Sequence, residues 1–264
     1  MNRLFKALCV IVTVLLSLFV AVALCNVFVG APAELVHALR DPALRQVVEV
    51  SLLTSLIAAG LAMLLGTPVA YVLARRRFFG KAAVETLLDL PVALPPMVAG
   101  LALLVLVSPT SPFGHVLNGM GVHLIFTQAG IVLAQLFVAL PFYIRAVRSA
   151  ITAIPPSIPA AAALLRATEA YTFFHVILPL SREGIISGFV MCWTRALGEF
   201  GATAMVAGCI PGVTETLPIA IYTRATAGDL AFAGAAALCL ALVSFATLIG
   251  LRLAFSDGEE RRRA

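Results

Sequence analysis

Long apolar stretches alternate with short polar segments along most of the chain. The first lies near residues 7–30 and carries no charge, and the second, near 50–74, ends at Arg75, Arg76 and Arg77. Each is close to the ~20 residues with which an α-helix crosses the ~30 Å hydrocarbon core of a membrane. The pattern therefore predicts membrane-spanning helices.

The middle of the chain holds an apolar stretch that is too long for one span. Charged residues are absent from 90–144, and turn-forming residues at 108–114 divide this stretch. We therefore predict two spans, near 88–108 and 128–147, with a loop between them. The prolines expected to kink or break these helices are Pro95, Pro96 and Pro141.

A proline-containing segment at 149–183 is too polar to cross a bilayer, and we expect it to form a cytoplasmic loop. A fifth span follows near 184–208 and a sixth near 231–254. Six spans in one continuous domain (1–264) predict an all-α, polytopic membrane fold.

The composition agrees with this interpretation. Hydrophobic residues make up 61% of the chain and charged residues 12%, whereas soluble domains are about half apolar and about a quarter charged. A soluble core of this length could not hide so much apolar surface, so lipid must cover much of it.

The basic residues are distributed unevenly between the two sides of the predicted helices. With the N-terminus inside the cell, the inner segments hold 14 of the 18 Lys and Arg residues and the outer loops hold three, while Arg195 lies within a span. Basic residues accumulate in cytoplasmic loops. Both termini should therefore be cytoplasmic, and the number of spans should be even.

The sequence lacks the common signatures of an enzyme. It has no G-x-x-x-x-G-K-[ST] phosphate loop, no H-E-x-x-H metal-binding pair and no G-x-S-x-G nucleophile turn. The five cysteines include no C-x-x-C pair and lie in apolar runs, so we interpret them as packing residues. We expect neither ATP hydrolysis by this chain nor a metal or other cofactor.

The segment at 149–183 resembles the EAA loop of binding-protein-dependent ABC permeases. In that family the pattern E-A-A, three residues, G, nine residues and I-x-L-P forms a short helix that docks in a groove of the cytoplasmic ATPase. Ala160 stands here where the family usually has Glu, and Arg166 where it usually has Gly. The residues that fit the pattern are Ala161, Ala162, Val176, Leu178 and Pro179. The resemblance implies that this segment couples the chain to an ATPase subunit.

The chemistry of the same segment also favours docking. Large apolar side chains occur in a loop that water should surround, namely Tyr171, Phe173, Phe174, Val176 and Ile177. An exposed apolar cluster of this kind generally marks a partner site. The residues could instead pack on the chain's own helix ends or lie at the lipid interface, and we favour docking mainly because of the resemblance.

A second and longer resemblance begins in the fifth predicted span. Residues 195–203 read R-A-L-G-E-F-G-A-T, and the match continues to Tyr222. It is similar to the molybdate branch of the sulfate/molybdate ABC permeases, as are L-P-P-M-V-A-G-L at 94–101 and A-L-P-F-Y at 139–143. The resemblance covers roughly 45–255. It implies a type I importer permease in the bacterial inner membrane, a second copy of the chain, two ATPase subunits and a periplasmic molybdate-binding protein.

Two charged residues interrupt the fifth span. Arg195 lies about 11 residues into it, near the middle of the bilayer, and Glu199 follows on the same helix face. They could help a doubly charged oxyanion to pass, or neutralise each other and fix helix packing. We favour packing, because a strong exposed site would trap the anion. The candidate pathway and gate residues are Arg195, Gly198, Glu199, Phe200, Gly201 and Thr203.

The sequence as a whole predicts the permease subunit of an ATP-driven importer for molybdate, with tungstate as a second substrate. Sulfate is the alternative cargo within the family, because a basic residue near mid-membrane suits any tetrahedral dianion. A secondary transporter without an ATPase is the alternative from another class. It would predict inverted repeats or more acidic residues within the spans, and the sequence has neither.

Overall fold

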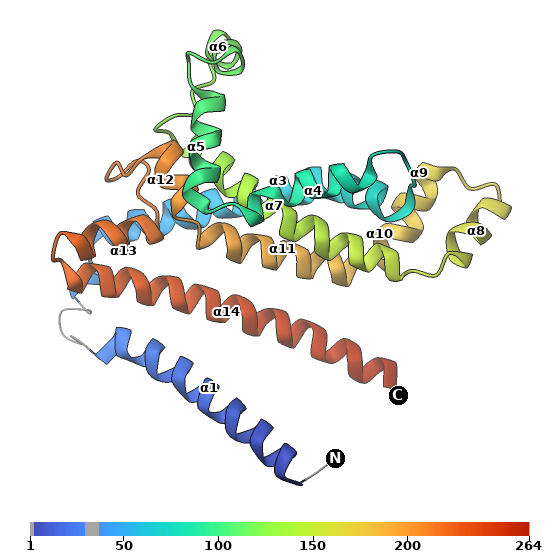
Figure 1. Cartoon of the computed structure of the whole chain (residues 1–264), viewed down its shortest axis with the longest axis horizontal. Helices are drawn as coiled ribbons and strands as arrows, with labels where there is room; N and C mark the ends of the chain where they lie inside the picture. Colours follow the sequence, from blue (N-terminus) through green and yellow to red (C-terminus); the bar gives the residue numbers. More distant parts are fainter. Residues whose placement is uncertain (1–2, 30–36, 264) are drawn as a thin grey trace.

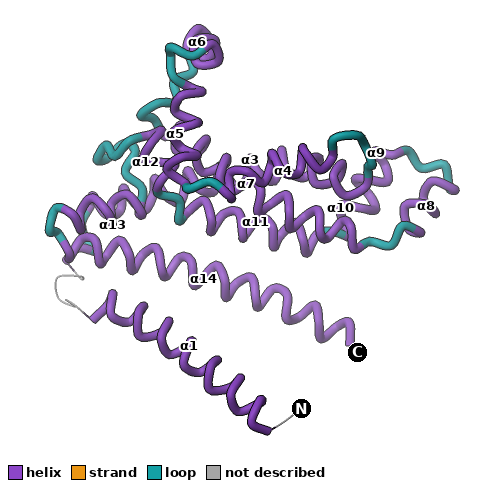
Figure 2. The backbone as a smooth tube through the Cα atoms, viewed as in Figure 1, coloured by secondary structure: helices purple, strands orange, loops and turns teal. Residues whose placement is uncertain are grey.

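The computed structural model describes residues 3–29 and 37–263, and the regular structure of these residues is entirely helical. In chain order the helices are α1 (Arg3–Val29), α3 (Pro42–Arg75), α4 (Lys81–Ala93), α5 (Pro96–Val107), α6 (Pro112–Gly119), α7 (Gln128–Ala153), α8 (Ser157–Leu164), α9 (Glu169–Thr172), η1 (Phe173–Ile177), α10 (Leu178–Leu180), α11 (Arg182–Leu197), α12 (Gly201–Ala207), α13 (Leu217–Thr226) and α14 (Leu230–Arg263). Figures 1 and 2 show the long helices running side by side, with α8 and α9 at one end and α13 at the other. The predicted first span ends at residue 30, which lies outside the described residues.

Three long helices, α3, α7 and α11, form the centre of the molecule and pack along one another. Their shared core is rich in alanine, with Ala59, Ala139 and Ala196 fully buried. Small side chains let helix backbones approach closely, which matters in lipid because burial of apolar surface gives no drive for association there. Tyr143 is also fully buried, and its hydroxyl lies 2.7 Å from the hydroxyl of Thr67 on α3.

The third predicted span consists of two helices that meet at a proline pair. α4 ends at Ala93, α5 begins at Pro96, and the two helices are bent by 113°. Leu94 is extended (φ −81°, ψ 145°), as a residue before proline usually is, and Pro95 has no N–H for a helical hydrogen bond. The break predicted at the proline pair is confirmed. As a result α5 points away from the bundle and carries α6 at its tip (Figure 1).

Pro141 has a different effect on the fourth predicted span. α7 continues through it as one helix of 26 residues, so the break predicted as one possible outcome at this proline is absent. A proline removes a single backbone hydrogen bond and crowds one turn. Helices α3 and α11 both pack extensively on α7, and this packing keeps the helix continuous.

The fifth predicted span is also divided. α11 ends at Leu197 and α12 begins at Gly201, with Gly198, Glu199 and Phe200 between them. The segment that precedes α11, formed by α9, η1 and α10, is bent from it by 72°. Both α11 and α12 stay in contact with α7, so the break lies inside the helical bundle.

The two terminal helices, α1 and α14, lie side by side along the outside of the bundle (Figure 1). Four of the described helices, α1, α3, α7 and α14, are long and apolar enough to cross a membrane, and the number rises to six if each bent pair is one span. In α1 the side chains from 5 to 22 are all exposed. The chain is therefore an all-α, multi-pass membrane protein.

Candidate functional site

The break between α11 and α12 is held together by Glu199. One carboxylate oxygen, Oε2, lies 2.7 Å from Nη2 of Arg195 on α11. The other, Oε1, accepts a hydrogen bond of 2.9 Å from the backbone N–H of Ala202 in the first turn of α12. Glu199 is almost completely buried, whereas the Arg195 side chain is 29% exposed. Glu199 thus uses both oxygens within the chain, and its link to Ala202 is a contact that the sequence pattern does not reveal.

Two of the motifs from the sequence pack against each other at this break. A Cβ atom added at Gly100 of α5 would lie 2.6 Å from Cα of Ala202, and one added at Gly201 would lie 3.0 Å from the backbone N of Met97. Any side chain at Gly100 would therefore push the two backbones apart, and one at Gly201 would press hard on α5. The L-P-P-M-V-A-G-L and G-E-F-G-A-T segments, about a hundred residues apart in the chain, form one close helix contact.

The six candidate pathway residues differ in how accessible they are. Glu199, Gly201 and Thr203 are buried, and the hydroxyl of Thr203 has no hydrogen-bond partner among the described residues. Gly198 is exposed. Phe200 is half-buried, and its ring centroid lies 5.1 Å from that of Tyr222 on α13. Surface near the break is therefore offered by Arg195, Gly198 and Phe200, while the buried residues shape the backbone beneath them.

The second candidate region runs from α8 through α10 and is exposed at one end of the bundle. Ala160, Ala161 and Pro179 are exposed, whereas Ala162, Val176 and Leu178 are half-buried. Phe174 is 60% exposed, but Phe173 packs edge-on against Tyr71 of α3 with ring centroids 4.8 Å apart. The two phenylalanines predicted to act together therefore have different surroundings.

Two leucines that the sequence pattern did not single out are the most exposed apolar residues of this region. Leu164 and Leu165 are 85% and 84% exposed at the end of α8. Glu169 forms an ion pair with Arg76, which lies just after α3, and Ile177 is buried in the core. The segment is thus anchored to the bundle while its apolar tip remains open to the surroundings.

Arg166 occupies a backbone position that normally calls for glycine. Its φ is +60°, in the left-handed region. The N–H of Arg166 donates to the carbonyl of Ala163 and the N–H of Ala167 donates to that of Ala162, both at 3.0 Å. These two bonds form a Schellman cap at the end of α8, in which the left-handed residue is usually glycine. The glycine of the EAA pattern therefore has a conformational reason, and Arg166 adopts the same turn at some cost.

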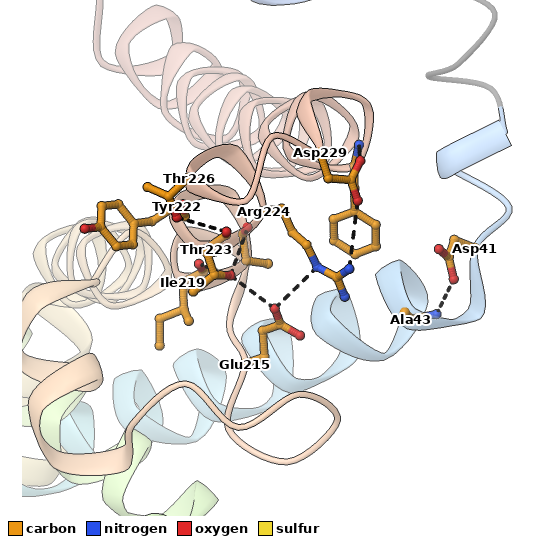
Figure 3. A network of polar contacts seen from close by, with 11 residues as sticks. Asp41, Ala43, Glu215, Ile219, Tyr222, Thr223, Arg224, Thr226 and Asp229 are labelled. Carbon is orange, nitrogen blue, oxygen red and sulfur yellow. Dashed lines mark hydrogen bonds and ion pairs between the residues drawn. The ribbon is translucent and has the colours of Figure 1, made fainter.

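The opposite end of the bundle holds a network of charged residues (Figure 3). Glu215 is buried (5% exposed) and lies 3.9 Å from Nε of Arg224, whose Nη1 lies 3.8 Å from Asp229. The guanidinium of Arg224 also lies over the ring of Phe232, 4.5 Å from its centroid. These contacts connect the loop before α13 to the start of α14, so the network stabilises the backbone at this end.

Residues 64–255 match the family described as binding-protein-dependent transport system inner membrane component. The chain belongs to this family, which comprises the membrane permeases of ABC importers. The matched range includes both candidate regions, namely the α8–α10 segment and the α11–α12 break.

Similar proteins carry both molybdenum and sulfate permease names. The molybdenum transport system permease protein ModB of Mycobacterium tuberculosis is 40% identical over 202 residues, which cover 76% of this chain and 75% of that protein. ModB of Azotobacter vinelandii is 36% identical over 210 residues, 79% of this chain and 91% of that protein. The sulfate transport system permease protein CysW of Synechococcus elongatus is 33% identical over 237 residues, 88% and 83% of the two chains.

A solved structure has the same fold. A chain of the bacterial alginate ABC transporter, crystallised with an alginate pentasaccharide-bound periplasmic protein, superposes with a TM-score of 0.73. The match covers 96% of this chain and 93% of that chain at 16% sequence identity. The bent helices described above therefore form the fold of an ABC importer permease.

Proposed function

We propose that this chain is the permease subunit of an ATP-driven importer that carries molybdate, with tungstate as a second substrate, across the bacterial inner membrane. The observation that carries this proposal is the similarity to two permeases named for molybdenum transport, at 40% and 36% identity. The relative named for sulfate transport is less similar, at 33% identity. The chain itself performs no chemistry, and a partner subunit hydrolyses ATP.

The α8–α10 segment is the proposed docking surface for that ATPase subunit. Leu164, Leu165 and Phe174 expose apolar surface at one end of the bundle, and such surface favours a protein partner over water. The ion pair between Arg76 and Glu169 joins the segment to α3. Movement of the docked segment therefore reaches the central helices directly.

With this docking, the α8 end of the bundle faces the cytoplasm and the α13 end faces the periplasm. Six spans and cytoplasmic termini follow, in agreement with 14 of the 18 basic residues falling on the inner side. The α13 end is then the surface for a periplasmic molybdate-binding protein. The charged network of Glu215, Arg224 and Asp229 keeps that surface in a fixed shape.

Cys209 provides a direct test of this orientation, because it is exposed in the loop between α12 and α13. Partial burial of the sulfur and the nearby charge of Glu215 raise the pKa of its thiol. Since the thiolate is the reactive form, labelling by a membrane-impermeant maleimide should be slow near pH 7 and faster near pH 9. Intact cells should be labelled, and Cys209→Ser should lose this label. Labelling of Cys209 only after lysis would place the loop in the cytoplasm.

A second copy of the chain is the proposed partner of the arm formed by α5 and α6. At its base α5 packs on α12, whereas Met97, Leu101 and Val105 are 55%, 48% and 63% exposed. The arm extends away from the bundle (Figure 1), so a symmetric partner could cover its apolar surface. In such a dimer the α11–α12 break, with Arg195 and Gly198 accessible, lies beside the base of each arm and is the proposed gate.

The cargo can be tested by deleting the gene. Molybdenum-dependent enzyme activity should fall at low external molybdate and recover when molybdate is in excess, while growth on sulfate as sole sulfur source stays unchanged. An ATPase subunit should copurify with the permease in mild detergent. Uptake by the purified chain without any ATPase would instead identify a secondary transporter.

Sulfate is the second candidate cargo, because the sulfate permease of Synechococcus elongatus matches 88% of this chain. Molybdate and sulfate are both tetrahedral dianions, so the charges of the permease do not separate them. The same deletion strain distinguishes the two. Loss of growth on sulfate with molybdenum enzymes intact would assign the chain to sulfate.

A further inference from the structure

The second half of α7 exposes a polar strip at the inner end of the predicted fourth span, whereas the neighbouring helices expose apolar side chains. Its exposed positions are Arg145, Ser149, Thr152 and Ala153. Within α7, all of which the structure describes, no large apolar side chain is exposed. By contrast, α3 exposes a long row of large apolar residues, including Leu53, Leu56, Ile57, Leu64 and Leu65. Helices such as α3 therefore supply the lipid-facing surface of the protein. The exposed part of α7 is polar and suited to contact with water.

Arg145 of this strip and the neighbouring, half-buried Arg148 are paired with carboxylates of α4, which packs beside α7. Nε of Arg145 lies 2.8 Å from Asp89, and Nη2 of Arg148 lies 2.9 Å from Glu85. Lys81 lies 3.8 Å from the same Glu85 oxygen. Three positive charges against two negative charges leave this cluster with a net charge of +1.

The pairing leaves much of each guanidinium available. Asp89 engages Nε of Arg145, and among the described residues no second carboxylate contacts its Nη groups. The side chains of Arg145 and Arg148 are 51% and 37% exposed. Together with Ser149, Thr152 and Ala153 they line a hollow of about 490 Å³. A liquid water occupies about 30 Å³, so the hollow can hold an oxyanion with part of its hydration shell.

The depth of the cluster determines which way it faces. Arg145 lies two residues before the end of the predicted fourth span at 147, and Arg148 lies just beyond that end, although α7 itself continues to Ala153. Charged side chains at the end of a span extend towards water, because contact with lipid is costly. On the proposed orientation, this hollow opens at the cytoplasmic end of the spans, where an imported anion leaves.

We infer that Arg145 and Arg148, with Ser149 and Thr152, form a weak site for a tetrahedral oxyanion in the cytoplasmic exit of the pathway. Guanidinium groups bind oxyanions through two parallel N–H bonds. Asp89 and Glu85 each hold part of a guanidinium, so the anion is attracted without being trapped, as a conducting path requires. The inference rests on the proposed function for the direction of transport and for the class of anion.

Removing the arginines and removing a carboxylate of the cluster should change its affinity for molybdate in opposite directions, which equilibrium binding can measure. The probe is radiolabelled molybdate, added at low ionic strength to the purified permease–ATPase complex without its binding protein, because salt screens exposed charges. Arg145→Gln with Arg148→Gln should weaken binding by about tenfold, and Asp89→Asn should strengthen it about threefold. Arg77→Gln, which removes an exposed arginine outside the cluster, should leave binding unchanged. Unaltered binding in both cluster variants overturns the inference.

Transport in proteoliposomes supplies a second readout. The double glutamine variant should lower uptake about threefold or more, while the binding protein still stimulates ATP hydrolysis. Arg145→Lys with Arg148→Lys should restore only part of the uptake, because the positive charge is retained but the two parallel N–H bonds are lost. Loss of stimulated ATP hydrolysis in parallel with uptake would indicate a structural role and overturn the inference.

Lipid composition distinguishes a transported anion from a lipid headgroup. The uptake defect of the double glutamine variant should be the same in vesicles of phosphatidylcholine alone and in vesicles that also contain phosphatidylglycerol. A defect that appears only with phosphatidylglycerol assigns the site to a lipid phosphate and overturns the inference. Failure of the proposed function looks different: the wild-type complex would not import molybdate, yet the opposite changes in oxyanion binding would remain.

Discussion

The α5–α12 contact and the α8–α10 segment both carry motifs shared with ABC permeases, but their surroundings differ. In the first, Gly100 and Gly201 bring two backbones together and leave no room for a side chain. In the second, Leu164, Leu165 and Phe174 are open to the surroundings. Motifs shared with the same family can thus have different roles within one protein. The buried motif maintains the fold, and the exposed motif remains available to a partner.

The comparison predicts that the largest loss of stability follows a change at the buried contact. Gly100→Val should cost roughly 3 kcal/mol, because its Cβ would overlap the backbone at Ala202. Thermal unfolding of the detergent-solubilised protein measures this loss. Gly119→Val is the matched control, since nothing lies within 4 Å of a Cβ at that position of α6. Equal stability of the two variants would contradict the close contact.

The exposed segment should respond in the opposite way. Leu164→Asp with Leu165→Asp should leave thermal stability unchanged, because both side chains are more than four-fifths exposed. The same change should abolish association with the ATPase, since it places charge in an apolar interface. Copurification of the ATPase measures the effect. A variant that still binds the ATPase and transports normally would rule out this surface.

Phe173 and Phe174 provide a second test of the difference between buried and exposed positions. Phe174→Asp should impair ATPase association with little effect on stability, whereas Phe173→Asp should also destabilise the protein, because its ring packs on Tyr71. Paired measurements of stability and copurification separate the two outcomes. Identical behaviour of the two variants would show that the packing of Phe173 is unimportant.

A smaller effect is expected at the break between α11 and α12. Glu199→Gln leaves the positive charge of Arg195 without its buried partner. Breaking a fully buried pair costs about 3–5 kcal/mol, and the partial exposure of Arg195 lowers our expectation to roughly 2 kcal/mol. Adding Arg195→Met should recover most of that loss in thermal unfolding. A purely additive double variant would show that the pair does not stabilise the break.

The smallest effect is expected at Arg166, and it is a gain. Arg166→Gly should stabilise the end of α8 by about 1 kcal/mol, because a side chain disfavours the left-handed conformation. Hydrogen exchange across 160–169 should slow accordingly. Leu165→Gly, with φ of −80° at the preceding position, is the control and should not slow exchange. Faster exchange in Arg166→Gly would contradict the expected strain.

Several features of the fold could be predicted from local residue chemistry. The break at Pro95 and Pro96 follows from the geometry of proline, which acts on its immediate neighbours. At Pro141 the prediction was a kink or a break, and the break is absent, because α3 and α11 pack on α7 and the helix stays continuous. The two consecutive prolines thus end a helix, whereas the single Pro141 is accommodated within one.

Only some of the contacts in the candidate site could be predicted from the sequence. The pairing of Arg195 with Glu199 was expected from helical spacing, and the two residues do pair, but Glu199 lies two residues beyond the end of α11 rather than on the same helix face. The bond from Glu199 to Ala202 forms across a break whose geometry no local pattern specifies. Likewise, the pairs Arg145–Asp89 and Arg148–Glu85 join positions more than fifty residues apart in the chain.

The amino-acid sequence alone specifies the class of fold, because apolar runs of span length and few charges make a membrane protein whatever their arrangement. It also located the family motifs, which are local strings of residues. The three-dimensional packing was needed to show which motif is buried against Gly100, which leucines of α8 are exposed, and which carboxylates accompany the arginines of α7. The physical reason is that burial and ion pairing depend on how helices distant in sequence meet, and that meeting is set by the packing of the whole bundle.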